Sequence, residues 1–234
     1  MSQLRLAIIG DGKMGRLVRA VAEEQRLDIA AILGRDQVLA DGISATTLRG
    51  ATVAIEFTQP DAAAANVRAC AHAGCAVVCG TTGWDVERAQ VESDVRAVGG
   101  ALLWAANFSL GVHLFTALVA EAARRAKAAG GFDAHLVETH HAAKLDAPSG
   151  TARHLARAAE AATGTSIPIT SVRVGSVPGT HALVLDGLYE QVQLVHEARD
   201  RRVFALGALA AARWLAGRRG VFTLDDMLSS PGGD

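Results

Sequence analysis

The chain has 234 residues, of which 50% are hydrophobic and 20% charged, and 23 Lys and Arg against 24 Asp and Glu give a formal net charge of −1. This composition is ordinary for a soluble globular protein with a sizeable core, and it excludes a disordered, collagen-like or disulfide-stapled chain. The balanced charge gives no footprint for nucleic acid or an anionic membrane, and no apolar run reaches the roughly 18 residues that span a bilayer. We therefore expect neither kind of partner.

The three cysteines, Cys70, Cys75 and Cys79, lie in apolar surroundings. An odd count in such a setting indicates reduced thiols and a cytoplasmic protein. Their spacing fits no zinc template, so we expect them to pack in the core and expect no metal site.

The first half of the chain alternates short apolar runs with helical patterns. Runs typical of buried strands cover 4–9, 28–33, 52–57, 75–79 and 101–105, and helical spacing covers 16–24, 61–72 and 85–98. Strands that alternate with helices predict βαβ units and a parallel sheet.

The pattern changes after Asn107. We expect a long helix over 110–129, an alternating strand over 133–139, a helix from about Ser149, strands between 167 and 195, and a last helix over 203–215. Turn sequences at 177–179 and 186–187 favour antiparallel hairpins. The sequence therefore predicts an α/β fold, with a Rossmann-type dinucleotide-binding domain and an α+β domain that has its own mixed or antiparallel sheet.

The first predicted strand runs directly into a glycine-rich loop, Gly10-x-Gly12-x-x-Gly15, and a helix follows. Gly10 permits a tight turn, Gly12 lets a pyrophosphate approach the backbone, and Gly15 lets helix and strand pack closely. The helix N-terminus adds free N–H groups and the positive end of its dipole. This position in an alternating pattern predicts a dinucleotide site. The alternative is a glycine turn that binds nothing.

The residues after the second predicted strand bear on the choice of cofactor. The usual fingerprint places Asp or Glu about 20 residues after the glycines, where it bonds the ribose 2′-hydroxyl. Here that place holds Gly34 and Arg35, and Asp36 comes one residue late. Because Arg35 suits a 2′-phosphate, we expect that NADPH is preferred or that NADPH and NADH both work.

The densest group of reactive side chains lies in residues 138–152, which read Glu-Thr-His-His-Ala-Ala-Lys-Leu-Asp-Ala-Pro-Ser-Gly-Thr-Ala. Histidine is readily tuned for proton transfer near neutral pH, and lysine both donates protons and pairs with anions. Ser149 is a candidate N-cap, with the N–H groups of Gly150 and Thr151 at the helix start. Proton donors beside an anion site predict a small anionic substrate.

Each of these residues also has an interpretation without a catalytic role. His140 and His141 would be ordinary residues at a strand end, and Lys144 would be a solvated loop charge. A metal site on the two histidines is a further alternative, but no third ligand at usable spacing stands out. The combination of this segment with the phosphate loop favours an enzyme.

At this segment the sequence resembles the 4-hydroxy-tetrahydrodipicolinate (dihydrodipicolinate) reductase family of diaminopimelate and lysine biosynthesis. The family signature, Glu-x-His-His-x-x-Lys-x-Asp-Ala-Pro-Ser-Gly-Thr-Ala, is matched from Glu138 to Ala152. Further similar segments span nearly the whole chain, at 80–84, 105–112, 179–181 and 196–208. The glycine loop is one residue shorter than is common, and Gly34 replaces the acidic ribose partner of some members, which bears on cofactor preference.

The resemblance implies an NAD(P)H-dependent reduction of a cyclic imine dicarboxylate. By position in the signature, His140 is the acid/base residue and Lys144 the proton donor to the ring nitrogen. The expected substrate-binding residues are His141, Lys144, Ser149, Gly150 and Thr151. The expected cofactor-binding residues are Gly10, Gly12, Lys13, Met14, Gly15, Arg35, Gly80, Thr81, Thr82, Ala105, Ala106, Asn107, Phe108 and Arg201.

The resemblance also implies a domain arrangement. Residues 1–107 and 202–234 would form the dinucleotide-binding domain, and residues 108–201 the substrate-binding and oligomerisation domain of a homotetramer. One competing hypothesis is another NAD(P)-dependent imine or amino-acid oxidoreductase of the same layout. A second is a non-catalytic NAD(P)-binding sensor, which would have no need of His140 or Lys144.

Overall fold

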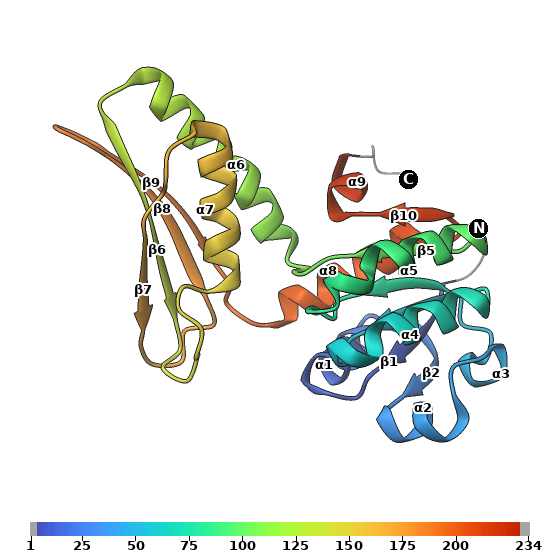
Figure 1. Ribbon diagram of the computed structural model, residues 1–234. Coiled ribbons are helices and arrows are strands. Elements are labelled where there is room, and N and C mark those ends of the chain that lie inside the picture. Colours follow the sequence, from blue (N-terminus) through green and yellow to red (C-terminus); the bar gives the residue numbers. More distant parts are fainter. Residues whose placement is uncertain (1–3, 230–234) are drawn as a thin grey trace. The chain divides into compact units, whose positions relative to one another are not determined.

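The computed structural model describes residues 4–229 of a chain that divides into two compact units (Figure 1). Unit 1 comprises Met1–Phe108 and Phe204–Asp234, and unit 2 comprises Ser109–Val203. These limits lie close to the expected domains, 1–107 with 202–234 and 108–201. Residues 1–3 and 230–234 of the expected first domain fall outside the described residues. Unit 2 is therefore an insertion in the chain of unit 1.

Unit 1 is built on a six-stranded parallel sheet with the strand order β10-β5-β4-β3-β1-β2. The strands are β1 (Arg5–Ile9), β2 (Asp28–Leu33), β3 (Val53–Glu56), β4 (Ala76–Cys79), β5 (Ala101–Trp104) and β10 (Gly220–Phe222). The parallel sheet confirms the predicted Rossmann-type α/β fold. The strand β10 was not predicted, because three residues are too few to show a periodicity.

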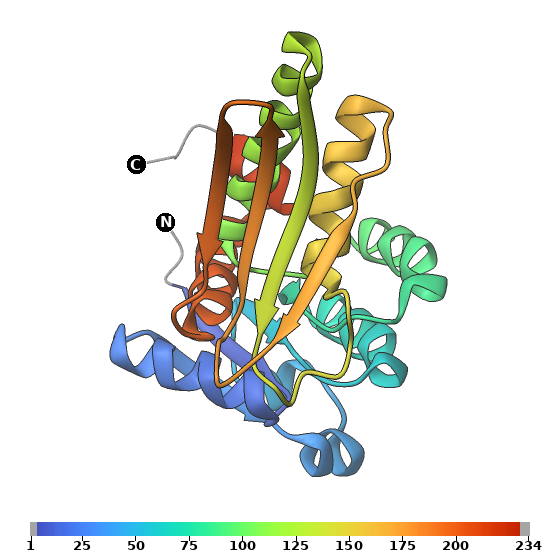
Figure 2. The ribbon, with the colours of Figure 1, turned by 90° about the vertical axis from the view of Figure 1, so that its left-hand side faces the viewer.

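Helices cover both faces of this sheet. They are α1 (Lys13–Glu24), α2 (Arg35–Asp41), α3 (Ala45–Leu48), α4 (Pro60–His72), α5 (Asp85–Ala97), α8 (Arg202–Leu215) and α9 (Leu224–Ser229). The helices α4 and α5 pack on one face and α1 and α8 on the other (Figures 1 and 2), which explains why the strands are apolar throughout. Cys70, Cys75 and Cys79 belong to the core under α4 and α5, as predicted. Among residues 4–229, no helix has both the length and the apolar character of a membrane span.

Unit 2 has a four-stranded sheet in the order β7-β6-β8-β9. Its strands are β6 (Phe132–His140), β7 (Ile169–Arg173), β8 (Thr180–Gly187) and β9 (Gln191–Glu197). The helices α6 (Leu110–Ala129) and α7 (Gly150–Thr163) cover one face, and Figure 2 shows the other face toward the viewer. The core between helices and sheet includes Phe115, Val119, Leu136, Leu155 and Leu183.

The position of β7 corrects one expectation from the sequence. The strands β8 and β9 form the predicted antiparallel hairpin, but the turn at 177–179 does not join neighbouring strands. Instead, β7 runs parallel to β6, with Leu136 opposite Ile169 and His140 opposite Arg173. The reason is that α7 separates β6 from β7 in the chain, and a crossover of this length is what parallel neighbours require. The sheet of unit 2 is therefore mixed.

Candidate active site

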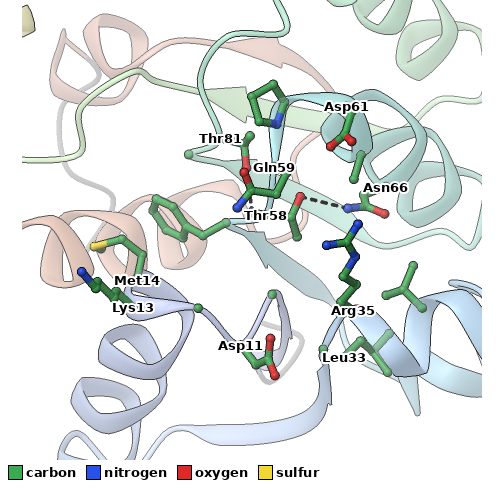
Figure 3. Close-up of a pocket in the computed structure, with 18 of the residues that line it drawn as sticks. Asp11, Lys13, Met14, Leu33, Arg35, Thr58, Gln59, Asp61, Asn66 and Thr81 are labelled. Carbon is green, nitrogen blue, oxygen red and sulfur yellow. Dashed lines mark hydrogen bonds between the residues drawn. The ribbon is translucent and has the colours of Figure 1, made fainter.

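A cavity of about 730 Å³ lies at the carboxyl ends of the strands of unit 1 (Figure 3). Its walls come from the loop after β1, the start of α2 and the segments after β3 and β4. This is the edge at which doubly wound sheets bind ligands, at the point where the strand order reverses. The predicted cofactor residues that line it are Gly10, Gly12, Lys13, Met14, Arg35, Gly80, Thr81 and Thr82.

The glycines of the phosphate loop have distinct roles. Gly10 has φ +103°, and a Cβ there would lie 2.1 Å from the carbonyl oxygen of Phe57. A Cβ on Gly15 would lie 1.8 Å from the carbonyl oxygen of Gly10, whereas no described atom lies within 4 Å of a Cβ on Gly12. In the described part of the chain, no side chain caps α1 and its first turn holds no acidic residue. The open face at Gly12 and the uncapped N–H groups fit a pyrophosphate.

A cation and a carboxylate both line the cavity near the end of β2. Arg35 begins α2 and its side chain extends into the cavity (Figure 3), and no carboxylate within residues 4–229 forms an ion pair with it. Asp11 also lines the cavity, and a Cβ on Gly34 would lie 2.9 Å from its Oδ2. Sequence reasoning missed Asp11, because it sought the acidic residue after β2 and not in the glycine loop.

A buried carboxylate that sequence reasoning also missed lies beneath the cavity. Glu56 ends β3 and is fully buried. Thr81 Oγ1 donates to its Oε2 at 2.7 Å, Asn66 Nδ2 donates to its Oε1 at 3.3 Å, and the Thr58 hydroxyl also donates to Oε1. The carboxylate thus connects the segments after β3 and β4. A charged residue that closes the apolar run Val-Ala-Ile-Glu is the signal that could have identified it.

The other predicted cofactor residues lie outside the lining just described. Gly15 packs behind the loop, and residues 105–107 follow β5, which is separated from β3 by β4. Phe108 packs edge-on against the lining residue Phe57, with ring centroids 6.1 Å apart. Arg201 belongs to unit 2, just before α8. Contacts of these residues with a cofactor remain predictions.

In unit 2, the predicted catalytic segment begins at the end of β6. Alternate residues of β6 face the helices, and this inner row changes from the apolar Leu136 to Glu138 and then His140, all three buried. The Glu138 carboxylate bonds His140 Nδ1, and Arg173 Nη2 donates to its Oε1 at 2.7 Å. Burial by itself raises the pKa of Glu138, but hydrogen bonds from Arg173 and His140 outweigh it and hold the pKa at about 2.

The imidazole of His140 is enclosed on several sides. Burial lowers its pKa below the ordinary value, although the hydrogen bond to Glu138 opposes this shift. The ring of His181 stands edge-on to it at 5.2 Å, and burial lowers the pKa of His181 to about 4. A Cβ on Gly179 would lie 3.0 Å from His140 Nε2, so a side chain there would cover this atom.

The loop after β6 and the start of α7 hold the other predicted residues of unit 2. Lys144 Nζ pairs with Asp146 Oδ1 at 2.7 Å, and its backbone N–H donates to the carbonyl of His141 at 3.1 Å. Ser149 is the N-cap of α7, as predicted, because its Oγ accepts from the N–H of Ala152 at 3.1 Å. Gly150 and Thr151 then open the helix. Ser149 Oγ also hydrogen-bonds His181 Nε2 at 3.3 Å.

The described residues include a group with the donor atoms of a metal site. One ligand atom each from Glu138, His140 and His181 lies within 4.8 Å of the others. This group differs from the His140 and His141 pair considered in the sequence, because its third member comes from β8. Its carboxylate is already bonded to Arg173 and His140, which is typical of a hydrogen-bond network.

Two family models together match most of the chain. Residues 4–108 match the model described as dihydrodipicolinate reductase, N-terminus, and residues 111–228 match the one described as dihydrodipicolinate reductase, C-terminus. The chain belongs to the dihydrodipicolinate reductase family. This confirms the resemblance of the signature from Glu138 to Ala152.

Relatives and solved structures agree with membership of the dihydrodipicolinate reductase family. The chain is 42% identical over 231 residues to the 4-hydroxy-tetrahydrodipicolinate reductase of Xanthomonas euvesicatoria pv. vesicatoria, covering 93% of this chain and 94% of the relative. It is 41% identical over 238 residues to that of Stenotrophomonas maltophilia, covering 96% and 98%. The dipicolinate-bound dihydrodipicolinate reductase structure from Paenisporosarcina sp. TG-14 has a TM-score of 0.80 at 21% identity, covering 94% and 97%, and so shares the fold.

Proposed function

We propose that the protein catalyses the NAD(P)H-dependent reduction of 4-hydroxy-tetrahydrodipicolinate to tetrahydrodipicolinate in diaminopimelate and L-lysine biosynthesis. One observation carries this proposal. At the end of β6, a buried His140 bonded to Glu138 is followed by the Lys144 loop and by the start of α7, in a chain of the dihydrodipicolinate reductase family. The Paenisporosarcina structure is named as holding dipicolinate, a dicarboxylate of the expected class.

The start of α7 and its neighbouring cation suit a dicarboxylate. A helix N-terminus offers unpaired N–H groups and the positive end of the helix dipole. We expect Ser149, Gly150 and Thr151 to present these groups to one carboxylate. His141 and Lys144, on the loop before the helix, would contribute a positive charge and hydrogen bonds to the same substrate.

The proposed chemistry divides between the cofactor and this chain's own residues. Bound NAD(P)H supplies the hydride. Lys144 donates a proton to the ring nitrogen, where electron density accumulates, and a cation held there stabilises that change. His140 acts as the acid/base residue beside it. Reduction of the 4-hydroxy compound also releases water.

Binding of the cofactor is proposed for the cavity of unit 1, with NADPH preferred or both cofactors accepted. The guanidinium of Arg35, which pairs with no carboxylate among residues 4–229, supports NADPH because it suits a 2′-phosphate. The Asp11 carboxylate beside Gly34 supports NADH, because it suits a 2′-hydroxyl. The two groups together are the physical basis for accepting both.

We also propose a homotetramer joined through the sheet of unit 2. The face of this sheet that α6 and α7 leave uncovered is turned toward the viewer in Figure 2. Exposed apolar residues of its strands include Val172 and Val195. The mass of the assembly in solution tests the proposal, and a monomer would contradict it. A cytoplasmic location is proposed as well, supported by three buried cysteines that remain free thiols.

The reductase proposal is tested by oxidation of NADPH and NADH with the purified protein. The substrate is made fresh from pyruvate and aspartate semialdehyde by the synthase that precedes the reductase. Rapid oxidation that depends on the synthase is the expected result, and the same run gives the cofactor preference. Absence of oxidation, from protein shown to be folded and cofactor-bound, would favour another imine or amino-acid oxidoreductase. Cofactor binding without turnover of any imine would indicate a sensor.

A further inference from the structure

The carboxylate of Glu138 has no part in the proposed chemistry, yet it forms hydrogen bonds with His140, Arg173 and Ser149. It lies on the inner face of β6, two residues before His140, and its side chain is 1% exposed. Its Oε2 bonds His140 Nδ1. Its Oε1 accepts from Arg173 Nη2 at 2.7 Å and from the N–H of Ser149 at 3.3 Å.

The charge of Glu138 determines which protons its partners carry. A carboxylate this deeply buried stays ionised only when it is paired and hydrogen-bonded, and the ion pair with Arg173 meets that need. An ionised carboxylate can only accept hydrogen bonds. His140 Nδ1 must therefore carry a proton, which leaves Nε2 of the neutral ring as the acid/base atom.

The surroundings of His140 hold the ring in that orientation. The His181 ring packs edge-on against it, and Gly179, which has no side chain, adds none against Nε2. The charged and titratable groups facing His140 are Glu138 on β6, Arg173 on β7, His181 on β8 and Lys144 on the loop. Glu138 is the anion among them, so it alone can fix the proton on Nδ1.

The same pair of residues also anchors the segment that leads into α7. Glu138 accepts the N–H of Ser149, the N-cap residue, while Arg173 Nη2 donates to the carbonyl of Asp146 at 2.5 Å. Asp146 in turn pairs with Lys144. One buried ion pair therefore holds both the imidazole and the loop that carries the lysine.

We propose that Glu138 is a positioning residue that fixes His140 as the Nδ1-protonated tautomer and anchors the start of α7, with Arg173 keeping the carboxylate ionised. The effect on turnover rests on the proposed reductase function. The tautomer of His140 and the anchoring of α7 do not depend on that function, because both are properties of the free protein.

The test uses Glu138→Gln, which keeps the shape and removes the charge. Imidazole ¹⁵N NMR of the full-length protein, with the His140 signals identified from His140→Gln, reports the tautomer. We expect the wild type to show a proton on Nδ1, and Glu138→Gln to lose that single state because an amide can donate to Nδ1 as well as accept. We expect kcat to fall at least about 10-fold, with the KM for NADPH unchanged, since partners that orient a reacting imidazole contribute this much or more.

Two further variants separate positioning from general damage. Glu160→Gln is the matched control, since Glu160 Oε1 accepts a backbone N–H from Ile167 at 3.0 Å at the other end of α7. We expect its tautomer and kcat to match the wild type. Glu138→Asp keeps the charge and should restore the Nδ1-protonated state and part of kcat.

Several outcomes would overturn the proposal. A wild-type His140 protonated on Nε2 would do so without any change at Glu138, so failure of Glu138→Gln to fold does not remove the test. An unchanged tautomer together with a kcat within about twofold of the wild type in Glu138→Gln would also overturn it. If the wild type shows no reductase activity but His140 carries its proton on Nδ1, the proposed function fails and the positioning role stands.

Discussion

Arg173 on β7 and Glu138 on β6 form a buried ion pair, with Nη2 and Oε1 2.7 Å apart and side chains 18% and 1% exposed. Both residues lie in the sheet, but their partners lie at the end of unit 2 that is proposed to bind the substrate. The pair links the stability of unit 2 to the geometry of the residues proposed to move protons.

Removal of one partner from this pair should destabilise the protein strongly. Arg173→Leu leaves the Glu138 carboxylate buried without its counterion, and we expect the free energy of unfolding to fall by about 3–5 kcal/mol. Urea denaturation measures the change. Arg157→Leu, at an exposed position of α7, is the control and should change stability by less than about 0.5 kcal/mol. An equal loss of unfolding free energy in the two variants would contradict a specific stabilising role for the ion pair.

Buried neutral histidines should make unit 2 sensitive to mild acid. Burial lowers the pKa of His181 from 6.5 to about 4, and burial also lowers the pKa of His140 and of His196. A group whose pKa is lower in the fold stabilises fully above its ordinary pKa, and this contribution is lost as the pH falls through the folded value. His181 should therefore reduce the free energy of unfolding by up to about 1.4 kcal/mol per pH unit as the pH falls from 6.5 to 4, and His140 and His196 should act in the same direction below pH 6.5.

Urea unfolding at a series of pH values checks this slope. His181→Gln should reduce the dependence of the free energy of unfolding on pH by the contribution of one histidine. The contribution of Glu138 falls in a different window, since its pKa lies below its ordinary value of 4.5 and its loss begins only below that pH. A slope that is the same with and without His181 would contradict the assignment of this residue.

Loss of either proposed proton-transfer residue should reduce turnover while the fold survives. Changing Lys144 or His140 to Ala should lower kcat by about 10²- to 10⁴-fold, because a well-placed acid or base contributes that much. The coupled reductase assay gives kcat, and circular dichroism checks the fold. Lys127→Ala on α6 is the control for loss of a lysine. Near-normal turnover in folded Lys144→Ala would remove the role assigned to it.

Arg35 should determine the affinity for the 2′-phosphate of NADPH. A hydrogen bond to a charged group contributes about 1.5–3 kcal/mol, so Arg35→Ala should raise the KM for NADPH by roughly 10- to 100-fold and leave that for NADH little changed. Arg19→Ala, which removes an exposed arginine of α1 paired with Glu23, should alter neither. Equal effects on both cofactors would place Arg35 away from the 2′-phosphate.

Glu56 should control the shape of the cofactor cavity from beneath. In Glu56→Gln an amide NH₂ would face groups that donate to the carboxylate, namely the hydroxyl of Thr81 or the amide of Asn66. We expect a loss of about 1–3 kcal/mol in the free energy of unfolding and a weaker Kd for NADPH, measured by titration calorimetry. Glu92→Gln, at a partly exposed position on α5, should change neither quantity. Unchanged binding in Glu56→Gln would limit its role to stability.

Much of the fold could be predicted because its signals are local. The apolar runs of unit 1, the helix at 110–129 and the Ser149 cap follow from side-chain period and from capping chemistry over a few residues. The short helices α2 and α3 were not predicted, because seven and four residues are too few to show a helical pattern. The proposed catalytic segment could be identified because its reactive residues are close in sequence.

The partners of that segment could not be predicted. Arg173 is 35 residues from Glu138 and reaches it only because β7 pairs parallel to β6. His181 lies opposite Glu138 on β8, which is a matter of strand register. Register depends on the packing of the whole sheet, and no short stretch of sequence contains it.

The insertion of unit 2 has a consequence for the sheet of unit 1. Phe108 is the last residue of the first part of unit 1, and a Cβ on Gly207, early in α8, would lie 1.7 Å from its carbonyl oxygen. The segments β5, α8 and β10 would form an ordinary strand–helix–strand crossover if the chain ran straight on, since β5 and β10 are parallel neighbours. The six-stranded sheet of unit 1 contains no strand of unit 2, so replacing Ser109–Val203 with another folded segment would leave every strand pairing of that sheet intact.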